Sequence, residues 1–102
     1  MGLAEGAPQL LVIGPNGEPA ESISVTRDPV VIGRLSTNDV VLSDPNVSRR
    51  HAEVRRRGNE FIVVDLGSTN GTKVNGAGVR ERRLADGDDI TVGGTHIRFE
   101  AS

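Results

Sequence analysis

Three short segments of the sequence combine arginine, hydroxyl and amide side chains with glycine. The first is Gly33-Arg34, the second runs from Ser48 to His51, and the third covers residues 68–72. Arginine offers a planar fork that meets two oxygens of an anion at once, and hydroxyl and loop N–H groups can bind the remaining oxygens. If the three segments meet at one rim of the fold, that rim is suited to an oxyanion such as phosphate.

Ser48 and His51 also invite a catalytic interpretation, because serine and histidine can act as nucleophile and base. No orienting acid and no oxyanion motif accompanies them in the sequence, so we favour a structural role for His51. The chain has no Cys, and His51 and His96 are its two histidines, which excludes thiolate chemistry and disfavours a histidine metal site. We therefore expect a protein that is not an enzyme and that holds neither a metal nor a cofactor.

The elements that position these segments are predicted to be β-strands. Short runs of Val, Ile and Leu alternate with Gly, Asn, Asp and Pro, and no stretch keeps the spacing of an amphipathic helix. We expect about ten strands, over residues 10–13, 22–26, 30–32, 39–42, 51–57, 60–65, 73–75, 82–84, 89–92 and 95–100. Asn16-Gly17 is expected to form a tight hairpin turn. This pattern favours a β-sandwich, with a small barrel as the alternative.

Length and charge restrict the function further. The 102 residues are enough for one core, so we expect a flexible N-terminal segment or linker over 1–8 and a single domain over 9–100. A net charge of −2 and only two aromatic residues argue against nucleic acid. The lack of a long apolar run argues against membrane insertion, and the lack of Cys fits the cytoplasm. The basic clusters at 55–57 and 80–83 could steer acidic phosphopeptides toward the rim or keep an edge strand soluble.

In their order and spacing, Gly33-Arg34, Ser48-x-x-His51 and Asn70-Gly71 resemble the signature of the forkhead-associated (FHA) domain. The similarity continues through residues 38–42, 47–51, 65–76 and 84–90 and covers about two-thirds of the chain. The resemblance implies an all-β, two-sheet sandwich of about eleven mostly antiparallel short strands, with binding loops at one end. It also implies that these loops bind phosphothreonine peptides.

The resemblance assigns roles to individual residues. The expected phosphate contacts are Arg34, Ser48, Arg49 and Thr69. Asn70 would bind the peptide main chain, and Asn46 and the 76–80 loop are candidates for reading the flanking sequence. The expected structural supports of the site are Gly33, His51, Gly71 and Asn75.

The function implied by the resemblance is a non-catalytic phosphothreonine-binding module in Ser/Thr-kinase signalling, a monomeric part of a larger protein. Its partner would be a phosphothreonine-containing protein, such as a Ser/Thr kinase or the substrate of one. The alternative is the same fold used as a phospho-independent scaffold or dimerisation domain. A competent residue occupies every phosphate-contacting position, which favours the first interpretation.

Overall fold

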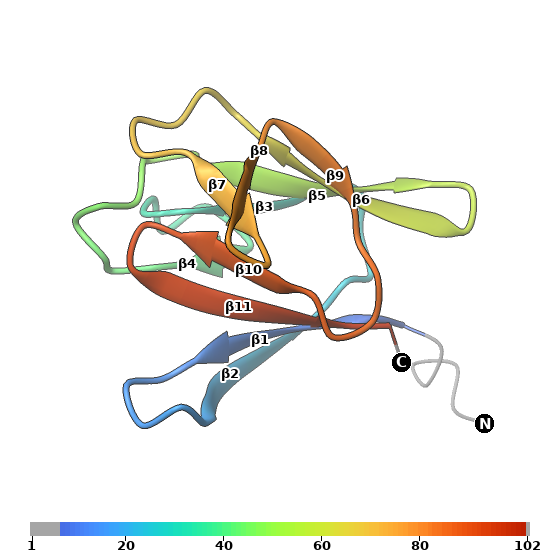
Figure 1. Ribbon diagram of the computed structural model, residues 1–102, viewed down its shortest axis with the longest axis horizontal. Coiled ribbons are helices and arrows are strands. Elements are labelled where there is room, and N and C mark those ends of the chain that lie inside the picture. The colour runs from blue at the N-terminus through green and yellow to red at the C-terminus, as the bar shows by residue number, and fades with distance from the viewer. Residues whose placement is uncertain (1–6, 102) are drawn as a thin grey trace.

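The computed structural model describes residues 7–101 and shows two β-sheets packed face to face (Figure 1). The strands are β1 (Gln9–Ile13), β2 (Pro19–Ser24), β3 (Val30–Gly33), β4 (Val40–Val41), β5 (Ala52–Arg57), β6 (Glu60–Asp65), β7 (Thr72–Val74), β8 (Ala77–Val79), β9 (Glu81–Arg83), β10 (Asp89–Val92) and β11 (Thr95–Glu100). One sheet has the order β2-β1-β11-β10-β7-β8 and the other β4-β3-β5-β6-β9. The predicted sandwich is thus confirmed, and the barrel alternative is wrong.

Strand pairing is antiparallel except between β3 and β4. Alternation along the strands sends apolar side chains inward from both sheets, as a two-residue period requires. Leu10, Ile90 and Phe99 are buried from the first sheet, and Ile32 and Val63 from the second. Within residues 7–101 no helix is long and apolar enough to cross a membrane.

The turn chemistry differs from the prediction at two Asn-Gly pairs. At Asn16-Gly17 only the glycine has positive φ, at 82°, and the loop is closed by the Gly14 N–H donating to the Glu18 carbonyl at 2.7 Å. The strand that follows, β2, runs over Pro19–Ser24 rather than over the predicted residues 22–26. Asn75 and Gly76 both have positive φ, at 52° and 86°, which is the conformation of a tight hairpin turn.

The hairpin at Asn75-Gly76 creates β8, a strand that the sequence pattern did not predict. Residues 76–80 were expected to form a loop, whereas Ala77–Val79 pair with β7. The sequence Ala-Gly-Val carries no polar and apolar alternation, so its strand character comes from pairing with Thr72–Val74 rather than from its own side chains.

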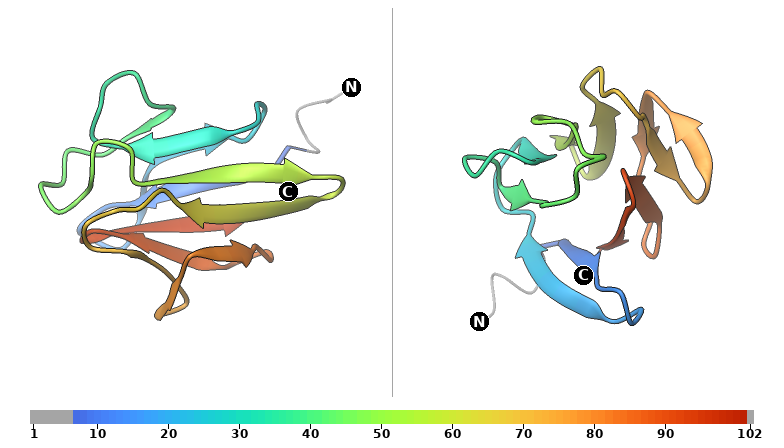
Figure 2. Two further views of the ribbon diagram at one scale, coloured as in Figure 1. Left: turned by 90° about the horizontal axis from the view of Figure 1, so that it is seen from above. Right: turned by 90° about the vertical axis from the view of Figure 1, so that its left-hand side faces the viewer.

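The two polar loops, 43–50 and 66–72, lie together at one end of the sandwich, while β1 begins and β11 ends toward the opposite end (Figures 1 and 2). The predicted N-terminal linker over 1–8 lies largely outside the described residues. Of its described part, the Pro8 carbonyl accepts a hydrogen bond of 2.8 Å from the Val25 N–H beside the first sheet.

Candidate functional site

Three segments that are distant in the sequence meet at the loop end. β3 ends at Gly33, so that the Arg34 N–H donates to the Ser48 carbonyl at 3.2 Å. The 66–72 loop follows β6, and its Leu66 N–H donates to the His51 carbonyl at 2.9 Å. The rim that the sequence suggested is therefore present in the fold.

Arg34 is exposed on this rim, and its direction is fixed by one hydrogen bond. Its Nε donates to the carbonyl of Val47 at 2.5 Å. Within the described residues its Nη atoms make no hydrogen bond or ion pair, so these two terminal nitrogens face no competing acceptor. The backbone contact thus orients a guanidinium group whose outer edge is available to an anion.

Gly33 is required because two backbone segments approach each other closely at its Cα. A Cβ at this position would lie 2.2 Å from the Arg49 carbonyl oxygen and 2.7 Å from Asn38 Nδ2. Asn38 Nδ2 itself donates to the Arg49 carbonyl at 2.7 Å, which leaves that oxygen little freedom to move aside. Any larger residue would therefore separate β3 from the 43–50 loop and displace the neighbouring Arg34.

His51 is fully buried and connects the two loops. Its Nδ1 accepts a hydrogen bond of 3.0 Å from the Ser48 N–H, and its Nε2 donates to the Gly71 carbonyl at 2.8 Å. These two contacts require the neutral tautomer with its hydrogen on Nε2. The ring bonds the backbone of Ser48 rather than its hydroxyl, so the pair lacks the arrangement of a nucleophile and its base.

Ser48, Thr69 and Asn70 form a second set of contacts between the loops. The Thr69 N–H donates to Ser48 Oγ at 3.1 Å, and Asn70 Nδ2 donates to the Asn46 carbonyl at 2.8 Å. Ser48 Oγ acts here as an acceptor, so its own O–H can donate to a ligand. Gly71 has a φ of 81°, which turns the chain back into β7.

The conformation of the 66–72 loop is stabilised by hydrogen bonds to the Asp65 carboxylate. This carboxylate accepts hydrogen bonds from the Gly67 and Ser68 N–H groups, each at 3.0 Å, from Ser68 Oγ at 2.5 Å and from Thr72 Oγ1 at 2.7 Å. Partial burial acts to raise the pKa of Asp65, but the hydrogen bonds from Ser68, Thr72 and Gly67 together lower it below its usual value. No role was predicted for Asp65, although an Asp followed by Ser three residues later is a local signal for such a turn.

Asp44 plays the same part in the 43–50 loop. It accepts from the Asn46 N–H at 2.8 Å, the Gly94 N–H at 2.7 Å and Thr95 Oγ1 at 3.2 Å, which joins this loop to the turn between β10 and β11. The Asn46 and Gly94 amides are the main reason that the pKa of Asp44 is lowered. The carboxylates of Asp44 and Asp65 are thus engaged by donors of the two loops, β7 and the β10–β11 connection, while Arg34 and Arg49 are exposed.

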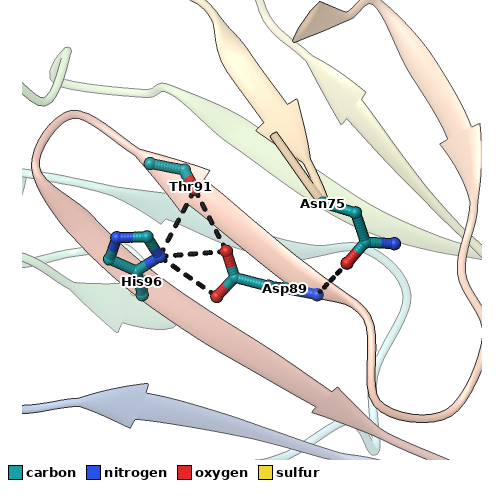
Figure 3. A network of polar contacts seen from close by, with 4 residues as sticks. All are labelled: Asn75, Asp89, Thr91 and His96. Atoms are coloured by element: carbon teal, nitrogen blue, oxygen red, sulfur yellow. Dashed lines mark hydrogen bonds and ion pairs between the residues drawn. The ribbon is translucent and has the colours of Figure 1, made fainter. Parts of the chain in front are cut away.

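Asn75 lies away from the other residues predicted to support the site. It occupies the turn at the far end of β7, where its Oδ1 accepts from the Asp89 N–H at 3.0 Å and its Nδ2 donates to Asp88 Oδ1 at 3.0 Å. Figure 3 shows Asn75 beside the start of β10 and the Asp89 carboxylate facing His96. Asp89 Oδ2 lies 2.9 Å from His96 Nδ1. The structure therefore brings Gly33, His51 and Gly71 to the loop end and leaves Asn75 outside it.

Fold and loop geometry together define a β-sandwich with exposed arginine, hydroxyl and amide side chains gathered at one loop end. A family model described as the FHA domain matches residues 30–93, and the chain belongs to this family. It is 40% identical over 99 residues to the oxoglutarate dehydrogenase inhibitor of Corynebacterium jeikeium, covering 96% of this chain and 67% of that protein. It is 41% identical over 99 residues to the glycogen accumulation regulator GarA of Mycolicibacterium smegmatis, covering 96% of this chain and 61% of that protein.

Solved structures share the fold. One is Mycobacterium tuberculosis EmbR in complex with a low-affinity phosphopeptide, which superimposes with a TM-score of 0.86 at 33% identity and covers 95% of this chain and 25% of the EmbR chain. The described sandwich thus corresponds to part of a longer polypeptide in EmbR, and the chain spans about two thirds or less of the two curated relatives.

Proposed function

We infer that this FHA domain binds phosphothreonine-containing segments of other proteins and catalyses no reaction. The observation that carries the proposal is the exposed, backbone-oriented guanidinium of Arg34 beside Ser48, in a loop cluster whose own carboxylates are engaged internally. EmbR, which shares the fold, forms a complex with a phosphopeptide, and this supports phosphopeptide binding by the present domain.

In the proposed complex the loop end replaces the water around the phosphate. A phosphothreonine carries about −1.5 to −2 charges at neutral pH, which Arg34 and Arg49 would balance. The Ser48 hydroxyl and Thr69 would bind the remaining phosphate oxygens. Because His51 and the Ser48–Thr69 contact already hold the two loops together, little conformational entropy is lost when the ligand binds.

Asn70 is the proposed contact to the peptide main chain. Its Nδ2 donates one hydrogen bond to the Asn46 carbonyl. Its Oδ1 can therefore accept from a backbone N–H of an extended peptide, and its second amide hydrogen can donate to a backbone C=O. This arrangement would fix the register of the peptide relative to the phosphate. Asn46 is exposed and bonded to Asn70 through its carbonyl, which supports its proposed part in reading flanking residues.

We propose residues 9–100 as the binding domain and a Ser/Thr kinase or its substrate as the partner. A phosphothreonine partner is produced by an ATP-dependent kinase, which supports a cytoplasmic site of action. The names of the relatives, an enzyme inhibitor and a regulator, fit a protein that acts by binding.

The decisive test is a titration of the folded domain with one peptide in three forms, carrying phosphothreonine, phosphoserine or unmodified threonine. Fluorescence anisotropy should show a Kd in the micromolar range, about −8 kcal/mol, for phosphothreonine. Phosphoserine should bind more weakly, because one buried methyl group contributes about 0.8 kcal/mol. Equal binding of the unmodified peptide, or none of any form, would favour the phospho-independent scaffold.

A further inference from the structure

The 43–50 loop is held in two halves, and each half is held by a different sheet. Its second half is tied to the end of β3 in the second sheet, where the Arg34 N–H donates to the Ser48 carbonyl at 3.2 Å. Its first half, residues 44–47, instead contacts residues 93–94, which form the turn between β10 and β11 of the first sheet. Figure 1 shows this β10–β11 turn at the same end of the sandwich as the two polar loops.

Asp44 both shapes the first half of the loop and anchors it. Its Oδ1 accepts a hydrogen bond of 2.8 Å from the Asn46 N–H, and its carbonyl accepts one of 3.0 Å from the Val47 N–H, which closes a tight turn. Its Oδ2 accepts from the Gly94 N–H at 2.7 Å and from Thr95 Oγ1 at 3.2 Å. One carboxylate therefore connects this turn of the loop to the opposite sheet.

Gly93 brings the β10–β11 turn into close contact with the loop. A Cβ at Gly93 would lie 2.8 Å from Val47 Cγ2 and 3.1 Å from the Asn46 carbonyl carbon. Gly93 also has a φ of 62°, which a larger residue adopts only with strain. The Val47 side chain is buried, so it has little room to move aside. A side chain at position 93 would therefore push Asn46 and Val47 away from the turn.

The two carbonyl groups beside Gly93 are the ones that orient two proposed binding side chains. The Val47 carbonyl accepts from Arg34 Nε at 2.5 Å, and the Asn46 carbonyl accepts from Asn70 Nδ2 at 2.8 Å. Arg34 is the proposed phosphate contact, and Asn70 is the proposed contact to the peptide main chain. The β10–β11 turn thus supports both side chains through two adjacent residues of the loop.

We propose that Asp44 and Gly93 are positioning residues of the phosphopeptide site. They act through the two carbonyl groups and direct Arg34 and Asn70 without touching the ligand. The inference rests on the proposed function and extends it to a support in the first sheet. A side chain that is already oriented loses less conformational entropy when the ligand binds, so a firm β10–β11 turn strengthens binding.

The first part of the test is the affinity of D44N for a phosphothreonine peptide. This change keeps the shape of the side chain but turns an NH₂ group toward backbone N–H donors, which breaks part of the anchor. Affinity should fall about three- to tenfold, which corresponds to the loss of one net hydrogen bond. Removal of a negative charge alone would favour an anionic ligand, so a decrease in affinity reports the lost positioning.

The second part is a readout that needs no ligand. In ¹H–¹⁵N spectra of the free domain, the Arg34 Nε–H and the Asn70 amide hydrogens should exchange with water faster in D44N than in the wild type, because their acceptor carbonyls are released. Backbone amides of β5 should keep their wild-type protection, which shows that the fold is intact. G93A should change the same two side-chain signals and also weaken peptide binding.

G87A is the matched control for G93A. Gly87 also has positive φ, at 87°, but a Cβ there would meet no atom within 4 Å beyond its chain neighbours. It precedes β10, at the end of this strand remote from Gly93. G87A should therefore carry the backbone strain of alanine at positive φ, visible in thermal melts, while affinity and both side-chain signals stay as in the wild type.

The outcomes separate the two levels of inference. Wild-type affinity in D44N or in folded G93A, or an equal loss in G87A, would overturn the positioning role. Weaker binding with unchanged Arg34 and Asn70 signals would overturn it too, because the turn would then act by another route. If G93A does not fold, D44N carries the test. If the wild type binds no phosphothreonine peptide, the proposed function fails, while the exchange rates still decide whether the turn orients the two side chains.

Discussion

At the scale of single residues, the buried His51 ring holds together the two loops that form the exposed loop end. Its two nitrogens satisfy the Ser48 N–H and the Gly71 carbonyl, so the proposed phosphate and peptide contacts share one support. We expect His51→Ala to lower stability by about 2–4 kcal/mol, since it empties a buried site and leaves two polar groups without partners. Phosphopeptide binding should weaken as a consequence.

Thermal melts of the His51→Ala variant would measure this effect, with a decrease in Tm of about 10 °C or more. His96→Ala is the appropriate control, because His96 is exposed and its contact with the Asp89 carboxylate contributes less than about 1 kcal/mol. Equal melting temperatures for the two variants would show that His51 does not hold the loops together.

Arg34 is expected to behave in the opposite way, with a large effect on binding and a small one on stability. Its side chain is exposed and makes one hydrogen bond, to Val47, so Arg34→Ala should shift Tm by only a few degrees. Loss of a charged hydrogen-bonding fork should weaken phosphopeptide binding by about 2–3 kcal/mol, or roughly 30- to 150-fold. Arg34→Lys should recover only part of this, because an ammonium group cannot bond Val47 and grip two phosphate oxygens together.

Calorimetric titration of the wild type, Arg34→Ala and Arg34→Lys would compare their affinities directly. A Lys variant as good as the wild type would indicate that charge alone matters at this position. Unchanged affinity in the Ala variant would remove Arg34 from the proposed site.

At the scale of elements, the 66–72 loop is organised by the ionised carboxylate of Asp65. Because the pKa of Asp65 is lower in the folded state, its stabilising contribution is complete above the unfolded value of about 3.9 and is lost as the pH falls through the folded pKa. Asp44 shifts in the same direction, so acid should loosen both loops. Asp65→Asn should lower the free energy of unfolding by about 1–3 kcal/mol near neutral pH. It should also remove the decrease of this free energy in acid that the protonation of Asp65 causes.

Denaturant unfolding of the wild type and Asp65→Asn between about pH 2 and about pH 7 would isolate that contribution. The difference in unfolding free energy should be greatest near neutral pH and shrink in acid. A constant difference across this range would mean that the ionisation of Asp65 is not what stabilises the loop.

The same elements show what the sequence could predict. Alternating side chains indicated β5, a short apolar run indicated β6, and the order of Gly33-Arg34, Ser48, His51 and Asn70-Gly71 pointed to the family and to the candidate site. The two Asn-Gly pairs were not distinguishable locally, because the turn at Asn75 depends on hydrogen bonds to Asp88 and Asp89, which are distant in the sequence. The inter-loop bonds Asn46–Asn70 and Ser48–Thr69 are likewise tertiary, so no local pattern contained them.

At the scale of the whole molecule, the net charge of −2 conceals an uneven distribution. Within the described residues seven Lys and Arg side chains form no ion pair, and four of these seven, Arg34, Arg49, Arg50 and Arg80, are exposed at the loop end. A phosphorylated segment would thus be attracted most strongly to this end of a weakly acidic protein. Such a field acts mainly on the rate of association and on orientation rather than on the final contacts.

This distribution predicts a specific response to salt. Raising ionic strength from about 0.05 M to about 0.5 M shortens the screening length from about 14 Å to about 4 Å, so the association rate of a phosphopeptide should fall several-fold while its dissociation rate changes little. Arg50→Gln should reduce this salt dependence, because it removes charge beside the proposed phosphate contacts, whereas Arg56→Gln should not. Stopped-flow anisotropy measures the association and dissociation rates. An association rate that does not change with salt would mean that the arginines at the loop end act only after contact. The long-range attraction inferred from their placement would then be wrong.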